Sequence, residues 1–166
     1  MGTNRWWRGG LAVAVAVAGG WAWLADVRAP GPLGLEQQGA SICMQGTDGA
    51  IATGVLRGPS GPATTLTRVT LGSGSGLAVD DAVLAHPGPD GVRVGTASWP
   101  LPDDPWRAEP AIGTPIRPGE SVDLVLHVVR TGSDGGSAGP VRVEYVQGAE
   151  RHVETTGFHV ALRDHC

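Results

Sequence analysis

SVDLVLHVVR, residues 121–130, is the stretch that decides the fold of this chain. Asp123, Val125 and His127 lie on one face of an extended strand there, because successive side chains of a strand point to opposite sides. Four apolar residues occupy the other face: Val122, Leu124, Leu126 and Val128. The turn residues Pro118-Gly119-Glu120 come directly before. This pattern predicts a β-strand with its apolar face directed into a core.

The same alternation continues toward the C-terminus. Residues 141–145 alternate valine or tyrosine with charged residues, and residues 147–150 form a turn. Residues 151–162 then return as a strand with an apolar face made by Phe158, Val160 and Leu162. Gly157 lies in the middle of this strand and predicts a bulge. The last third of the chain therefore predicts one strand followed by a hairpin.

Four shorter strands are predicted upstream, at residues 50–56, 65–71, 82–85 and 92–98. Glycine-rich breaks at residues 72–76 and 87–91 separate them. From residue 36 onward, no segment carries a 3.6-residue apolar stripe. Short strands with turns every 8–12 residues are typical of an all-β sandwich or barrel.

The succession of turn 118–120, strand 121–130, glycine-rich loop 131–140 and hairpin 141–162 resembles the last three strands of immunoglobulin-like modules on bacterial surfaces. The Cys–Trp–Cys spacing of antibody domains is absent, and Tyr145 is too far from Cys166 for a tyrosine corner. The resemblance implies an antiparallel immunoglobulin-like β-sandwich. It also implies a role as a spacer, adhesive unit or docking surface, although a fold does not fix a function.

The N-terminal part contains an uncharged apolar run over residues 9–25. As a helix it would span roughly 25 Å, close to the lower limit for a hydrocarbon core of about 30 Å. Tryptophan and arginine flank the run, and indole rings favour the membrane interface. The expected interface residues are Arg5, Trp6, Trp7, Arg8, Trp21 and Trp23. The sequence therefore predicts a single transmembrane helix over residues 9–25.

Charge predicts the direction of this helix. Arg5 and Arg8 lie before it, so the positive-inside rule places residues 1–8 in the cytoplasm and the C-terminal domain outside. A Pro/Gly linker over residues 26–35 then leads to a domain over residues 36–166. The alternative is a signal peptide cleaved after one of the small-x-small patterns within residues 14–18, which would secrete the domain.

Cys43 and Cys166 are the two cysteines of the chain, and they lie near opposite ends of the expected domain. Thiols outside the cell tend to pair, and an even count agrees with that. The alternative makes Cys166 a metal ligand together with a histidine near it in sequence, namely His152, His159 or His165. The spacing has no CxxC pattern, so we expect a disulfide.

Composition limits the partners. The net charge of the chain is −4 at pH 7. From residue 29 onward the chain contains nine Arg and fifteen Asp and Glu, so the net charge of this part is −6. A mildly acidic domain lacks the basic patch with which proteins bind nucleic acid. The expected partners are the membrane and an unidentified protein or glycan, with no nucleic acid.

Chemistry-bearing motifs are scarce. His127, His152 and His159, with the acid pairs at residues 80–81 and 103–104, are the metal-binding candidates, but a site needs three or more converging ligands. No HxH or HExxH spacing occurs. We therefore expect no metal and no cofactor, and a secreted metal-binding β-sandwich that uses these His and Asp residues is kept as an alternative.

Motifs of exported hydrolases are equally scarce. Residues 72–76 (GSGSG) hold the letters of the G-x-S-x-G motif in the wrong order, and an S-x-x-K motif needs a lysine that the chain lacks. Cys166 beside His165 is the only candidate thiol nucleophile. The sequence predicts no catalytic residue, and a divergent exported hydrolase is a further alternative.

Trp99 and Trp106 frame the segment WPLPDDPW. Two indoles on a proline-stiffened loop would make a platform for a sugar ring or a peptide. Alternatively, one or both fold back to cap the open end of the sandwich, because Tyr145 and Phe158 are the only other aromatic residues of the domain.

Together these features predict an all-β, immunoglobulin-like antiparallel β-sandwich preceded by a single N-terminal transmembrane helix. The expected function is a membrane-anchored, extracytoplasmic, non-catalytic binding or assembly module of a bacterial cell envelope.

Overall fold

The structure is a computed structural model that describes residues 31–35, 38–103 and 105–166. The transmembrane helix predicted over residues 9–25 and its six interface residues lie outside the described residues. Within the described ranges, we find no helix that is both long enough and apolar enough to cross a membrane. Every named element there is a strand, so the all-β prediction is confirmed.

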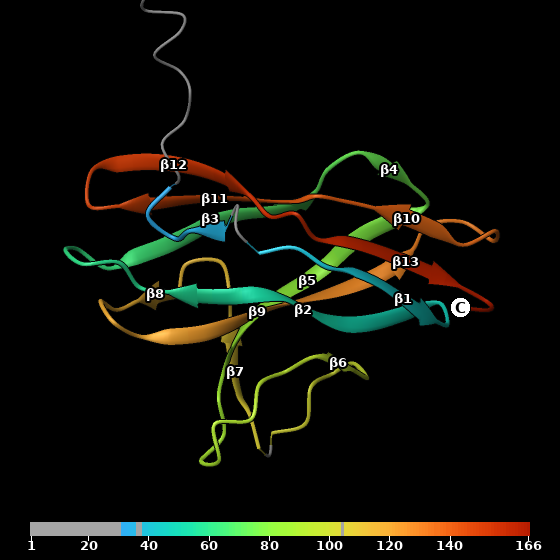
Figure 1. Ribbon diagram of the computed structural model, residues 1–166, viewed down its shortest axis with the longest axis horizontal. Coiled ribbons are helices and arrows are strands. Elements are labelled where there is room, and N and C mark those ends of the chain that lie inside the picture. The colour runs from blue at the N-terminus through green and yellow to red at the C-terminus, as the bar shows by residue number, and fades with distance from the viewer. Residues whose placement is uncertain (1–30, 36–37, 104) are drawn as a thin grey trace, which may run out of the picture.

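The described strands form three sheets (Figure 1). The five-stranded sheet has the order β6 (Thr96–Ala97), β2 (Asp48–Arg57), β9 (Ser121–Arg130), β5 (Leu77–His86) and β7 (Arg107–Pro110). All neighbouring strands in it are antiparallel. The strand predicted over residues 121–130 is thus β9, at the centre of this sheet.

Two four-stranded sheets complete the fold. The β11 sheet has the order β12 (Glu150–Thr155), β11 (Val141–Gln147), β3 (Thr64–Leu71) and β8 (Pro115–Ile116). The β13 sheet has the order β1 (Ser41–Gln45), β13 (His159–Arg163), β10 (Gly136–Ala138) and β4 (Gly74–Ser75). Figure 1 shows β12, β11 and β3 above β2 and β9, and the main core holds side chains from all three sheets.

The main core takes the apolar face of β9 that the alternation predicted. Val122, Leu124, Leu126 and Val128 are all at most 1 % exposed. Apolar side chains of β11 and β13 face them, including Val143 and Leu162. Full burial of one such side chain stabilises the fold by about 1.5–3 kcal/mol relative to exposure. Hydrophobic burial around β9 is therefore the main source of stability.

The predicted strands at residues 50–56 and 65–71 are confirmed as parts of β2 and β3, and residues 82–85 belong to the longer β5. The strand predicted over residues 92–98 is wrong except at Thr96–Ala97. The carboxylate of Asp123 accepts hydrogen bonds from the Val94 amide at 2.9 Å and from Arg93 at 3.0 Å. The Asp123 side chain therefore binds the Val94 amide, whereas the Gly95 carbonyl accepts a hydrogen bond from the Ala52 amide of β2 at 2.8 Å.

The strand predicted over residues 151–162 is also wrong as a single element. It ends with β12, and the chain passes to the β13 sheet before β13 begins at His159. Gly157, where a bulge was expected, lies in this break, and its amide donates to the carbonyl of Gln38 at 2.8 Å. A Cβ atom on Gly39 would lie 3.0 Å from the carbonyl oxygen of Gly157. The two backbones therefore approach closely at this break, which favours glycine at position 39.

Residues 31–35 were assigned to the linker, yet Leu33 and Leu35 are buried in the main core. The Glu154 carboxylate of β12 accepts hydrogen bonds from the amides of Leu33 at 3.0 Å and Leu35 at 2.8 Å, and from the Tyr145 hydroxyl. A Cβ atom on Gly31 would overlap the Glu154 side chain. A buried carboxylate needs such donors, so this contact fixes the first described segment to the β11 sheet.

The predicted disulfide joins Cys43 of β1 to Cys166, with 5.8 Å between their Cα atoms. The sequence separation of 123 residues makes nearly the whole described chain one covalent loop. The bridge therefore ties the last residue of the chain to the edge strand of the β13 sheet.

Reduction of this disulfide is expected to lower the free energy of unfolding by up to about 5 kcal/mol, because closure of a long loop restricts the unfolded chain. Urea unfolding with and without a phosphine reductant measures the change. A double variant, Cys43→Ser with Cys166→Ser, should match the reduced protein. Equal unfolding midpoints in both conditions would contradict the bridge.

Tyr145 gives a prediction for alkaline pH. The pKa of Tyr145 lies well above its ordinary value. Burial of the hydroxyl is the largest cause, and the hydrogen bond to Glu154 is the second. Stability from this shift is present below about pH 10, where the unfolded tyrosine is still protonated, and is lost as the pH rises further. The chain has one tyrosine and no lysine. Unfolding free energies between pH 9 and 11 should therefore fall steeply, and Tyr145→Phe should flatten the slope; an equal slope in both proteins would contradict this.

Candidate functional site

A histidine held between two aspartates occupies the outer face of β9. His127 is 7 % exposed. Its Nδ1 lies 3.1 Å from Asp80 Oδ2, and its Nε2 lies 3.4 Å from Asp48 Oδ2. Asp48 begins β2 and Asp80 lies in β5, the two strands that flank β9. The register shifts between Val79 and Asp81, and such a bulge re-aims the side chain of the extra residue.

Trp99 covers this histidine. The indole and imidazole rings are stacked, with centroids 4.7 Å apart and planes 4° from parallel. The two imidazole nitrogens each face a carboxylate oxygen, and the indole covers one face of the imidazole ring. The cluster of His127, Asp48, Asp80 and Trp99 is therefore a closed network that holds the Trp99 loop.

The outer face of β9 binds the 87–106 loop through three alternate residues. Asp123 binds Arg93 and Val94, Val125 packs in a second apolar cluster, and His127 stacks on Trp99. The other members of that cluster, in the core or packed against it, are Ala50, Ala52, Val83, Ala85, Val94, Ala97, Trp99, Leu101 and Trp106. The face that the sequence marked as polar is therefore covered by this loop.

Trp99 and Trp106, predicted as a ligand platform, are both half-buried against this cluster. The Trp106 Nε1 donates to the carbonyl of Val92 at 3.2 Å. One face of the Trp99 ring stacks on His127, and Trp99 also lines a groove between β1 and β6. Both indoles therefore fold back onto the protein, as the alternative expected, although onto the outer sheet face and not the open end. Ligand binding by the pair stays a prediction.

A groove of about 680 Å³ lies between β1 and β6, at the edges of two sheets. We call it the edge groove. Its lining residues are Cys43, Met44, Gln45, Asp48, Gly49, Thr96, Ala97, Ser98 and Trp99. Asp48 is the only charged residue among them, so the groove has an acidic character. It offers an indole, a carboxylate, an amide, two hydroxyls and strand backbone.

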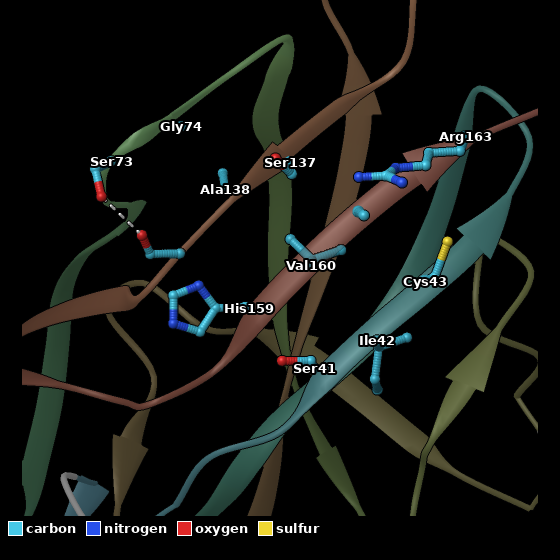
Figure 2. A pocket seen from close by; sticks show the side chains of 12 residues that line it. Ser41, Ile42, Cys43, Ser73, Gly74, Ser137, Ala138, His159, Val160 and Arg163 are labelled. Atoms are coloured by element: carbon cyan, nitrogen blue, oxygen red, sulfur yellow. Dashed lines mark hydrogen bonds between the residues drawn. The ribbon is translucent and has the colours of Figure 1, made fainter. Parts of the chain in front are cut away.

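A second hollow, of about 430 Å³, lies over the β13 sheet (Figure 2). We call it the sheet hollow. Figure 2 shows His159 and Arg163 near opposite ends of β13, with Ser73, Ser137 and Ser41 around them. None of the described residues that line it is acidic. Residues of β1, including Cys43, line both hollows, so this strand separates an acidic groove from a basic one.

The three candidate histidines are not brought together, although Asp80 of the candidate acid pairs contacts His127. His127 lies in the five-stranded sheet, His152 in β12 and His159 in β13. His152 stacks on Tyr145, with ring centroids 5.1 Å apart. Over the described ranges, no group of three His, Cys, Asp or Glu side chains is arranged to hold a metal ion. The metal-binding alternative therefore has no ligand set among those residues.

The glycine–serine run at residues 72–76 forms the short strand β4 and its flanks. Ser73 Oγ donates to the carbonyl of Gly139 at 3.2 Å, which fastens this connection to the chain before β11. Among the described residues, the His159 imidazole makes no hydrogen bond to a serine hydroxyl. This arrangement is that of a structural connection, without the nucleophile–base contact that a hydrolase needs.

Comparison of the chain with protein-family models, curated proteins and solved structures finds no match. Its fold and site are therefore described from its own residues.

Three features of the site were missed by sequence reasoning. Asp48 and Asp80 were not assigned to His127, although its place on the polar face of strand 121–130 was the available signal. β1 was not predicted, because SICMQ is short and its alternation rests on Ile42 and Met44 alone. The edge groove depends on β1 and was missed for the same reason.

His127→Ala should lower the free energy of unfolding by about 2 kcal/mol or more, because it removes the contacts to Asp48 and Asp80 and the ring stack on Trp99 from a buried position. His159→Ala is the matched control, since His159 is exposed and its loss should change stability by less than about 0.5 kcal/mol. Urea unfolding at pH 6 measures both. Equal losses for the two variants would contradict the structural role of the His127 cluster.

Proposed function

We propose that this protein is a membrane-anchored, extracytoplasmic binding or assembly module of a bacterial cell envelope, with an immunoglobulin-like topology and no catalytic role. The edge groove, with Trp99 and Asp48 in its wall, is the observation that carries the proposal. Its partner is a protein or a glycan.

The strand order supports the immunoglobulin-like part of the proposal. Such sandwiches carry strands B, E and D in one sheet and C, F and G in the other. Here β2, β9 and β5 are neighbours in one sheet, and β3, β11 and β12 in another. In chain order, β2, β3, β5, β9, β11 and β12 match strands B, C, D, E, F and G. The resemblance stated for residues 118–162 covers E, F and G.

The disulfide supports an exterior location, because structural disulfides persist in oxidising compartments and are rare in the cytosol. The apolar run at residues 9–25 supports attachment to the membrane, with residues 1–8 inside. Cleavage of that run would make the same domain a secreted protein.

The His127 cluster supports a non-catalytic role. Both ring nitrogens face carboxylates and one ring face is covered by Trp99. A general base needs a nitrogen within reach of a substrate proton, and these contacts occupy both. This network thus shapes the groove wall, and neither ring nitrogen of His127 is free to act as a base.

Fractionation of cells that express the full chain with a C-terminal tag tests the placement. The protein should remain with membranes after alkaline carbonate extraction, be digested by external protease in spheroplasts, and carry no thiol that alkylates without prior reduction. Recovery of the full-length chain in the soluble extract with both thiols free would contradict the proposal.

A photo-crosslinker at Ser98, which lines the groove, tests for binding. It should capture a specific neighbour in native membranes, and Trp99→Ala should reduce that capture. Ser60, an exposed residue of the loop after β2, is the matched control position. Equal crosslinking from both positions would mean that the groove is not the binding surface.

A further inference from the structure

We infer that the free edge of β1 is a strand-addition site, and that it binds an extended, lysine- or arginine-containing segment of another protein. This inference rests on the proposed binding function and names the class of partner.

The free edge follows from the hydrogen-bond pattern. β1 and β13 run parallel, with Ser41 opposite His159 and Gln45 opposite Arg163. The His159 amide donates to the Ala40 carbonyl at 2.8 Å, and the Gly46 amide donates to the Arg163 carbonyl at 3.2 Å. Alternate residues of a strand face the same neighbour, so residues 40, 42, 44 and 46 face β13.

The other alternate residues, Ser41, Cys43 and Gln45, direct their amides and carbonyls away from β13. In the described part of the chain, β1 pairs with no second strand. Cys43 and Gln45 line the edge groove, which places this row of backbone groups at its wall. These unpaired backbone groups repeat every two residues, about 6.8 Å along the strand. The backbone of an added strand matches this spacing better than a sugar does.

This edge lacks the residues with which proteins protect exposed strands. Charged side chains and proline commonly block unwanted pairing at an edge. β12 and β7 carry charged residues, β8 contains Pro115, and β4 and β6 are only two residues long. β1, with the sequence SICMQ, contains no charge and no proline. Of the edge strands that the structure describes, β1 alone is both longer than two residues and unprotected.

The disulfide makes this edge a prepared site. Cys43 is the central residue of β1, and its bond to Cys166 fixes the strand at that point. A strand that is already held in its extended form loses little freedom when a partner adds to it.

Charge identifies the occupant as a cationic segment of another protein. Asp48 is 52 % exposed and is the one charged residue of the groove lining; Asp80, at 64 %, lies across His127 from it. A second copy of this chain would bring another Asp48 and a net charge of −4 to the same groove. A lysine or arginine side chain of an added strand would meet the exposed Asp48 carboxylate in the groove wall.

The test uses the full oxidised chain in detergent and an eight-residue peptide of alternating valine and lysine. Calorimetric titration should show saturable binding, and a peptide of alternating valine and glutamate should bind at least roughly tenfold more weakly. NMR spectra should show the largest shifts at the amides of Ser41, Cys43 and Gln45. No saturable binding of the lysine peptide, or shifts centred elsewhere, would overturn the inference.

Proline variants separate backbone pairing from side-chain contact. Gln45→Pro removes an amide that points into the groove and leaves the β1–β13 hydrogen bonds intact, so it should weaken binding roughly tenfold. Gln45→Ala keeps the amide and should bind within about twofold of the parent. Equal affinities of the two variants would overturn strand addition. If Gln45→Pro fails to fold, the NMR shifts of the parent chain decide the question.

Two further outcomes separate this inference from the proposed function. Concentration-dependent dimers that Ser41→Pro abolishes would make a second copy the occupant and overturn the cationic partner. Loss of peptide binding alongside specific crosslinking from Ser98 would overturn strand addition and leave the binding function standing.

Discussion

The burial of β9 on both faces is the constraint on which the rest of the structure depends. Its inner face supplies four apolar residues to the main core, and its outer face holds the 87–106 loop through Asp123, Val125 and His127. An antiparallel strand usually presents one face to water. Here the outer face is covered as well, because Asp123 binds the Val94 amide and His127 stacks on the Trp99 indole. That loop brings Trp99 to β6 and so forms one wall of the edge groove.

The opposite wall depends on a different set of contacts. β1 is held on one side by its parallel pairing with β13 and at its centre by the bond from Cys43 to Cys166. Glu154 fixes the chain that enters the domain by binding the amides of Leu33 and Leu35. These contacts bring the first described residues and the last residue of the chain against the same body of sheets. The groove therefore lies between two walls that are each fixed to the body of the protein, which suits binding by a preformed surface.

Local alternation was enough to predict what hydrophobic burial decides. The inner face of strand 121–130, the apolar set of Phe158, Val160 and Leu162, and the all-β class follow from side-chain period alone. The disulfide followed from the count and placement of the cysteines. Features set by contacts between distant segments could not be predicted. The Asp80 carboxylate reaches His127 because a register shift in β5 turns it, and residues 92–95 form no strand where the Asp123 side chain binds the Val94 amide. The passage between sheets at Gly157 likewise depends on a close approach of Gly39.

The central claim is that β1 is hydrogen-bonded on one side and open on the other. Amide hydrogen exchange in the oxidised, unliganded protein measures this residue by residue. Slow exchange is expected at Ile42 and Met44, whose amides face β13, and fast exchange at Ser41, Cys43 and Gln45, whose amides face away from it. Equal protection along the five residues would show that the outer edge of β1 is already covered, and would contradict the account.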